Sequence, residues 1–181
     1  MEKRVGVLVG TKGRGSNLAG LAEAGIPISI VVGADSSAPV HGVALRYGLN
    51  WQEIGYEDGY GERLERAFEG CDLICLAGYL RLLPTTVTDR HTVLNIHPSL
   101  LPAYGGKGMY GLHVHRAVLE AGEKESGCTV HRVSEVYDEG EIVLQARCPV
   151  LPEDTPETLS ARVLELEKLT YAAAVRKVLG A

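Results

Sequence analysis

The chain contains 181 residues, of which 45% are hydrophobic and 23% are charged, and its formal net charge is −5. This length and composition fit one globular domain with a sizeable core. The acidic balance argues against a general nucleic-acid surface or an anionic membrane surface, so an anionic metabolite would have to bind in a local pocket.

Targeting signals and disulfides are not expected. The apolar run at residues 5–9 is too short for the hydrophobic part of a signal peptide, and no apolar run approaches the length of a membrane span. The four cysteines lack a Cys-x-x-Cys spacing: they are Cys71, Cys75, Cys128 and Cys148. We therefore predict buried, reduced thiols in a cytoplasmic protein that makes no membrane contact.

The first half of the chain alternates short apolar runs with helical patterns. Strands are expected at residues 4–9, 28–32, 50–54, 72–77 and 93–96, and helices at residues 18–24, 38–47 and 60–69. This alternation predicts a mainly parallel sheet that is covered by helices on both faces.

The pattern changes after residue 96. A helix is expected at residues 112–121, and strands at 127–133 and 141–150 flank a turn-like segment. Thr155 and Pro156 suit the start of a long closing helix. The predicted fold is therefore α/β: an open, mostly parallel Rossmann-like sheet with helices on both faces and a C-terminal antiparallel strand extension closed by a long helix.

Three loops are expected at one edge of this sheet, because each follows the carboxyl end of a parallel strand. They are the glycine-rich loop at residues 10–17, the loop at 78–84, and the loop that begins around Asn95 and His97. In open parallel sheets, ligands bind beyond this edge. We therefore expect the binding site here.

Asn95 and His97 stand two residues apart at the end of a predicted strand, and Pro98 prevents a helix from starting there. An asparagine amide is a neutral hydrogen-bond donor and acceptor, and histidine titrates near neutral pH. The pair suits acyl chemistry. Taken alone, such a pair more often caps a strand and packs under a proline.

The glycine-rich loop ends in Gly15-Ser16-Asn17 and leads into a helix, whose N-terminus suits a phosphate group. We expect the phosphate of a small sugar phosphate there, and the simplest alternative is a tight turn without a ligand. A dinucleotide fingerprint would need a glycine at Leu18, although Asp35 stands where a ribose-binding acid would lie. A nucleotide-binding Rossmann module therefore stays an alternative.

Several other polar residues can be explained by ordinary structural roles. Asp138 lies in an acidic turn, and it would be functional only if the turn folded toward His97. Glu167 borders the apolar stripe of the last helix, where it either ends the stripe or binds a substrate ammonium. We predict no metal site and ordinary structural roles for the histidines without ligand spacing, namely His91, His113, His115 and His131.

Five motifs together resemble one family over nearly the whole chain. The strongest is Asn95-Ile-His97-Pro-Ser-Leu-Leu-Pro102, which is shared across the formyltransferase superfamily. The others are Gly15-Ser16-Asn17, residues 76–83, residues 135–140, and residues 161–163 with Glu167. With these motifs the chain resembles the folate-dependent phosphoribosylglycinamide formyltransferases of purine biosynthesis.

This resemblance implies a reaction and a role for each matching residue. The formyl group of the cosubstrate 10-formyltetrahydrofolate would pass to the amine of 5-phosphoribosylglycinamide without a metal. Asn95, His97 and Asp138 would be catalytic. Gly15, Ser16, Asn17 and Glu167 would bind the glycinamide substrate, and Leu80, Arg81, Leu82, Leu83 and Asn95 would bind the folate.

The resemblance also implies one formyltransferase domain at 1–181, with a phosphate-binding half at about 1–90 and a catalytic, folate-binding half at about 91–181. Leu164 stands where many relatives carry a polar or basic residue, and Asp35 where they often carry Asn, which affects the expected substrate affinity. A formyltetrahydrofolate hydrolase is the nearest alternative, and it would be expected to carry a further N-terminal domain. Only small-molecule partners are expected, with no nucleic acid, and the sequence leaves open whether the chain is a monomer or a homodimer.

Overall fold

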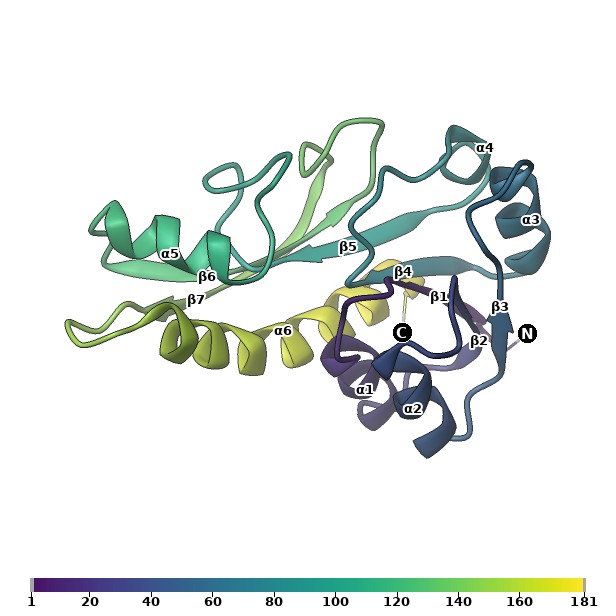
Figure 1. The fold of residues 1–181 in the computed structure, drawn as a ribbon, viewed down its shortest axis with the longest axis horizontal. Coiled ribbons are helices and arrows are strands. Elements are labelled where there is room, and N and C mark those ends of the chain that lie inside the picture. The colour runs from purple at the N-terminus through teal and green to yellow at the C-terminus, as the bar shows by residue number, and fades with distance from the viewer. Residues whose placement is uncertain (1, 181) are drawn as a thin grey trace.

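The computed structural model describes residues 2–180; Met1 and Ala181, the ends of the predicted domain, lie outside the described residues. Within them, one sheet contains seven strands in the order β3-β2-β1-β4-β5-β6-β7 (Figure 1). Its strands are β1 (Val5–Val9), β2 (Ile28–Gly33), β3 (Trp51–Glu53), β4 (Leu73–Ala77), β5 (Val93–His97), β6 (Glu125–Arg132) and β7 (Ile142–Pro149).

The pairing of the strands confirms the predicted fold class. The pairs formed among β1 to β5 are all parallel, whereas β6 is antiparallel to both β5 and β7. The helices are α1 (Ser16–Glu23), α2 (Pro39–Arg46), α3 (Tyr60–Ala67), α4 (Thr85–Thr88), α5 (Leu112–Glu120) and α6 (Pro156–Leu179). Helices α1, α2 and α6 pack on one face of the sheet, and α3 and α4 pack on the other (Figure 1).

The long closing helix begins where Thr155 and Pro156 predict it. The Thr155 hydroxyl accepts from the Thr158 amide at 3.2 Å, and the Thr158 hydroxyl accepts from the Thr155 amide at 2.9 Å. This reciprocal cap satisfies two amide groups that would otherwise lack partners at the helix end. The helix then runs for 24 residues and lies along the sheet.

Among the differences from the sequence expectation are a short additional helix and a longer fifth strand. Helix α4 is a single turn of Thr and Val residues after Pro84, and β-branched residues have low helix propensity, so the pattern does not predict it. Strand β5 extends through His97 because His97 pairs with Thr129 on β6. The candidate histidine therefore lies in the sheet itself, as its last residue.

The cysteines are free thiols, as expected, and Cys75, Cys128 and Cys148 are buried, whereas Cys71 is only half-buried. No helix among residues 2–180 combines the length and the hydrophobicity that a membrane span requires.

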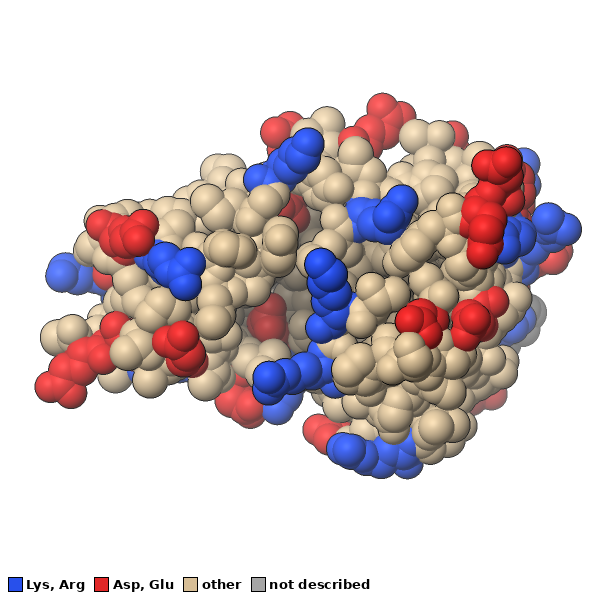
Figure 2. All heavy atoms as spheres, viewed as in Figure 1, with Lys and Arg blue, Asp and Glu red and all other residues tan. Residues whose placement is uncertain are grey.

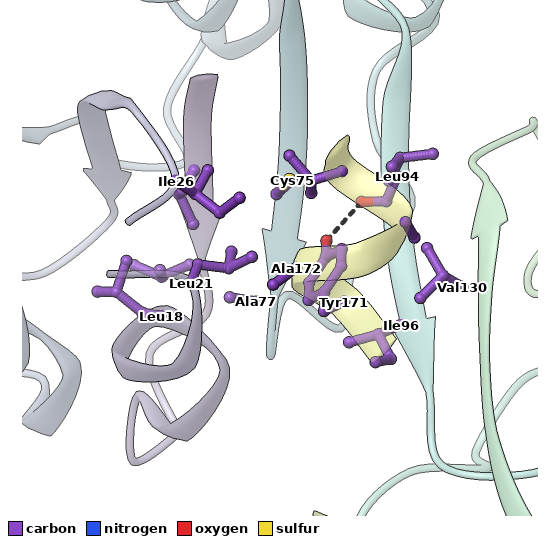
Figure 3. Close-up of a cluster of buried hydrophobic side chains, with 14 of the residues drawn as sticks. Leu18, Leu21, Ile26, Cys75, Ala77, Leu94, Ile96, Val130, Tyr171 and Ala172 are labelled. Carbon is purple, nitrogen blue, oxygen red and sulfur yellow. Dashed lines mark hydrogen bonds between the residues drawn. The ribbon is translucent and has the colours of Figure 1, made fainter. Parts of the chain in front are cut away.

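Tyr171 of α6 ties the helix to the two central strands. Its side chain is fully buried, and its hydroxyl hydrogen is shared between the carbonyl oxygens of Leu76 at 2.8 Å and Leu94 at 2.9 Å. Figure 3 shows the bond to Leu94. These carbonyls belong to β4 and β5, the two strands that lead into the 78–84 loop and the loop after His97. The contact fixes α6 to both strands on the face of the sheet that this helix covers.

We predict that Tyr171→Phe lowers the free energy of unfolding by about 1–3 kcal/mol, because it leaves two buried carbonyl groups without this donor. Urea denaturation followed by circular dichroism measures the change. Tyr110→Phe, at an exposed tyrosine, serves as the control and should leave stability unchanged. Equal stability of the two variants would contradict a structural role for the Tyr171 hydroxyl.

Candidate active site

A cavity of about 520 Å³ opens at the carboxyl edge of the parallel strands. Residues from all three predicted loops line it, including Asn17, Arg81 and His97, together with residues of the 131–138 segment and of α6. Figure 2 shows this face of the molecule hollowed near its centre, with lysine and arginine side chains around the hollow. The expectation that the three loops meet at one edge is confirmed.

His97 and Asp138 meet in the wall of this cavity. His97 Nδ1 lies 3.5 Å from Asp138 Oδ2, and both side chains are almost completely buried. The other ring nitrogen of His97, Nε2, donates to the Tyr104 carbonyl at 2.8 Å. The Gly106 amide donates to Asp138 Oδ2 at 2.9 Å, which anchors the carboxylate. The turn therefore does fold toward His97, with Asp138 itself at φ 58°.

Asn95 is linked to the same cluster through His131. Its amide nitrogen lies 3.3 Å from His131 Nε2, and that ring nitrogen lies 3.4 Å from Asp138 Oδ1. The strand register explains the contact, because Asn95 and His131 are paired across β5 and β6. Asn95, His97 and Asp138 thus lie within one hydrogen-bonded and charged cluster.

Two histidines that the sequence interpretation treats as ordinary belong to this site. His131 is buried within the cluster, and His115 of α5 is buried and lines the cavity. Burial, assisted by nearby His97, lowers the pKa of His115 to about 4. The local sequence around His115 and His131 does not predict this role. The strand register brings His131 to the cavity, and the packing of α5 brings His115 there.

The charges of the cluster are set by opposing effects. Burial lowers the pKa of His97 below its ordinary value, while the Asp138 carboxylate and the Tyr104 carbonyl oppose that shift. Burial alone would raise the pKa of Asp138, but the hydrogen bond from His131, the charge of His97 and the Gly106 amide together lower it. Asp138 therefore remains a carboxylate beside the imidazole near neutral pH.

The glycine-rich loop contributes Asn17 to the cavity wall. Gly15 precedes α1 at φ 80°, and a Cβ there would lie 2.8 Å from a Val43 methyl group, so glycine suits this tight turn. Gly15 is buried and Ser16 is the first residue of α1, and neither lines the cavity. Of the three residues predicted to bind substrate, only Asn17 lines the cavity together with the other candidate site residues.

Glu167 lies in the same end of the cavity as Asn17. It is 7% exposed, and burial raises its pKa to about 7, an effect that a hydrogen bond with Asn17 reduces. The Asn17 carbonyl oxygen is buried and has no hydrogen-bond partner among residues 2–180. Leu164 also lines this end, so the departure from a polar residue leaves an apolar wall there.

The predicted folate residues also line the cavity: Leu80, Arg81, Leu82 and Leu83. Leu83 is buried, whereas Leu80 and Leu82 are 44% and 49% exposed. The Arg81 guanidinium lies 4.2 Å from the ring centroid of Tyr56. This cation–π contact holds the charged Arg81 side chain at the edge of the cavity. This part of the cavity is therefore apolar with a charged rim.

The dinucleotide and metal hypotheses find little support in the structure. Asp35 is exposed, accepts from the Ser37 amide at 2.7 Å and does not line the cavity, which weakens the dinucleotide alternative. Among residues 2–180, no group of three or more His, Cys, Asp or Glu side chains is arranged to hold a metal ion.

Comparison with known proteins identifies clear relatives. The formyl transferase family model matches residues 49–175. Phosphoribosylglycinamide formyltransferase of Haemophilus influenzae is 35% identical over 96% of the chain and 86% of its own length. The crystal structure of phosphoribosylglycinamide formyltransferase from Brucella melitensis superposes with a TM-score of 0.85 at 39% identity, covering 99% of this chain and 97% of that one.

Other relatives are much longer than the matched part. The chloroplastic phosphoribosylglycinamide formyltransferase of Arabidopsis thaliana is 50% identical over 59% of this chain, and the match spans 37% of that protein. The chain thus spans little more than a third of this relative.

We predict that Asp138→Asn lowers the titration midpoint of the His97 imidazole, because the carboxylate stabilises the charged ring. NMR titration of the histidine ring signals measures the midpoint. The control Asp35→Asn removes an exposed carboxylate and should not change it. An unchanged midpoint in Asp138→Asn would return Asp138 to the role of a turn residue.

We also predict that Glu167 makes stability fall as pH rises. Its pKa is about 7 in the folded chain against an ordinary value of 4.5, so the folded state binds the extra proton between these values. Stability is therefore highest below about pH 4.5 and is lost up to about pH 7, by up to roughly 3 kcal/mol.

Urea unfolding of wild type and Glu167→Gln at pH 5 and pH 8 tests this dependence. Glu167→Gln should gain stability relative to wild type at the higher pH. Glu165→Gln, at an exposed position on the same helix, should show no such gain. A difference between wild type and Glu167→Gln that is constant with pH would contradict the burial argument.

Proposed function

Because this chain belongs to the formyl transferase family, we propose that it transfers the formyl group of 10-formyltetrahydrofolate to the amine of 5-phosphoribosylglycinamide. Formyl transfer to phosphoribosylglycinamide is the activity in the names of its phosphoribosylglycinamide formyltransferase relatives. The observation that carries the proposal is the meeting of Asn95, His97 and Asp138 in the wall of one cavity.

The two ends of the cavity suit the two substrates. The N-terminus of α1, with Gly15, Ser16 and Asn17, would hold the phosphate, and Glu167 would contact the glycinamide part. The apolar wall of residues 80–83 would hold the pterin ring of the folate, with Asn95 beside it. The reacting amine and formyl carbon would then meet between these ends, beside His97.

Asn95 and His97 would stabilise the developing negative charge. When the amine nitrogen bonds to the formyl carbon, the carbonyl oxygen becomes an oxyanion, and each preorganised donor to such an oxygen is commonly worth about 3 kcal/mol. Asn95 offers its amide hydrogens. His97 Nε2 would exchange the Tyr104 carbonyl for the oxyanion, and the Asp138 carboxylate would favour the charged ring against the effect of burial, which lowers the pKa of His97.

A proton must also move from the attacking amine to the departing N10 atom of the folate. Asp138 and His97 border the place where a water molecule would relay it. No covalent enzyme intermediate is required. The candidate nucleophiles support this view, because the Ser99 hydroxyl donates to the Ala103 carbonyl at 2.6 Å, and burial raises the pKa of Cys75 to about 12 and of Cys128 to about 11.

We further propose the cytoplasm as the working compartment and a homodimer as the assembly. The free, largely buried thiols support a reducing compartment. Apolar side chains on the surface, such as Leu45 at 66% and Leu169 at 74% exposure, offer area for a contact between copies. Sedimentation velocity distinguishes a homodimer from a monomer.

We predict that His97→Ala lowers kcat for formyl transfer by roughly 100-fold or more, because it removes one oxyanion donor and a proton carrier. Steady-state assays with both substrates measure the change, and circular dichroism checks the fold. His91→Ala, outside the cavity wall, is the control and should retain wild-type turnover. A folded His97→Ala variant with near-normal turnover would overturn the assignment.

A further inference from the structure

Thr129 and Gln145 stand in one row with His97. His97 on β5 is paired with Thr129 on β6, and Thr129 is paired with Gln145 on β7. Side chains that are paired across neighbouring strands project from the same face of a sheet. The row therefore places two polar side chains next to the histidine, on the same face of the sheet as Asn95 and His131.

These two side chains form a complete hydrogen-bond network with the chain that follows His97. The Thr129 hydroxyl donates to the Ser99 carbonyl at 2.7 Å and accepts from the Leu101 amide at 3.0 Å. The Gln145 amide group donates to the Leu101 carbonyl and to the Thr129 hydroxyl, each at 2.9 Å. Thr129 is fully buried, and its single donor and both acceptor positions are used.

The clamped segment delivers groups directly to the catalytic cluster. Its Tyr104 carbonyl accepts from His97 Nε2, and its Gly106 amide donates to Asp138. A Cβ on Gly105 would lie 3.2 Å from the Asp138 Cβ and 2.6 Å from a Leu101 methyl group, so this backbone packs tightly against the carboxylate. A displacement at Leu101 would therefore move both partners of the imidazole.

We propose that Thr129 and Gln145 are positioning residues, which clamp residues 98–106 and thereby orient His97 and Asp138 for the reaction. Neither needs to touch a substrate. The inference rests on the proposed function for its effect on turnover, but the orientation of His97 is a property of the protein alone. Buried networks of this kind hold a single geometry only while every member has its partner.

The test uses the near-isosteric pair Thr129→Val and Thr129→Ser in the full chain. Thr129→Val removes the hydroxyl, and we expect kcat to fall at least tenfold, with KM for the glycinamide substrate within about twofold of wild type. The NMR titration midpoint of His97 should fall, because the imidazole loses the ordered Tyr104 carbonyl and Asp138 beside it. Thr129→Ser keeps the hydroxyl and should restore both values.

Two further variants keep the test decisive. Gln145→Leu, at a half-buried site, removes two donors and should shift both readouts in the same direction even if Thr129→Val does not fold. Thr170→Val is the matched control, because Thr170 is buried on α6 outside the network and should leave both readouts unchanged.

A folded Thr129→Val or Gln145→Leu variant with wild-type kcat and an unshifted His97 midpoint would overturn the clamp. Equal losses in Thr129→Ser and Thr129→Val would also overturn it, since the hydroxyl would then be irrelevant. If the wild type shows no formyl transfer, the proposed function fails, while the His97 midpoint still decides the clamp.

Discussion

The antiparallel pairing of β6 with β5 is the constraint on which the site depends. It lays Asn95 opposite His131 and His97 opposite Thr129, so that these alternate residues of two strands project from the same face of the sheet. A slip of one residue would turn every one of these side chains to the other face of the sheet. The same pairing carries the following turn back over the strand ends, which brings Asp138 to His97. The register of the sheet therefore determines the geometry of the candidate site.

The site gathers groups whose burial opposes their charge. His97, Asp138 and Glu167 are all largely buried, and each has a pKa that burial and neighbouring dipoles displace. Such displaced values are typical of functional sites, where stability is given up for reactivity. The cost is offset by a hydrophobic core on both faces of the sheet and by anchors such as the Tyr171 hydroxyl. The rigid strands thus support a cluster that would be unfavourable on its own.

Local pattern predicts the architecture and the edge of the sheet where the site lies. Apolar runs and the Thr155 start of α6 are local signals, and the structure agrees with them. The local sequence pattern is less informative about the cluster of polar side chains. His131 and Asp138 lie far along the chain from Asn95 and His97, and only the strand register brings them together. His115 is likewise brought in by helix packing, and Ser16 shows the reverse case: its motif predicts phosphate contact, yet it does not line the cavity. Long-range pairing is the information that local patterns lack.

The most direct test of the account is the release of the formyl group from a 10-formyl folate analogue, measured with and without 5-phosphoribosylglycinamide. The account predicts that deformylation depends on the glycinamide substrate and that formylated product appears in equal amount. The end of the cavity that holds Asn17 and Glu167 has a role only if a second substrate binds there. Deformylation at the same rate without the glycinamide substrate would make water the acceptor and contradict the transferase.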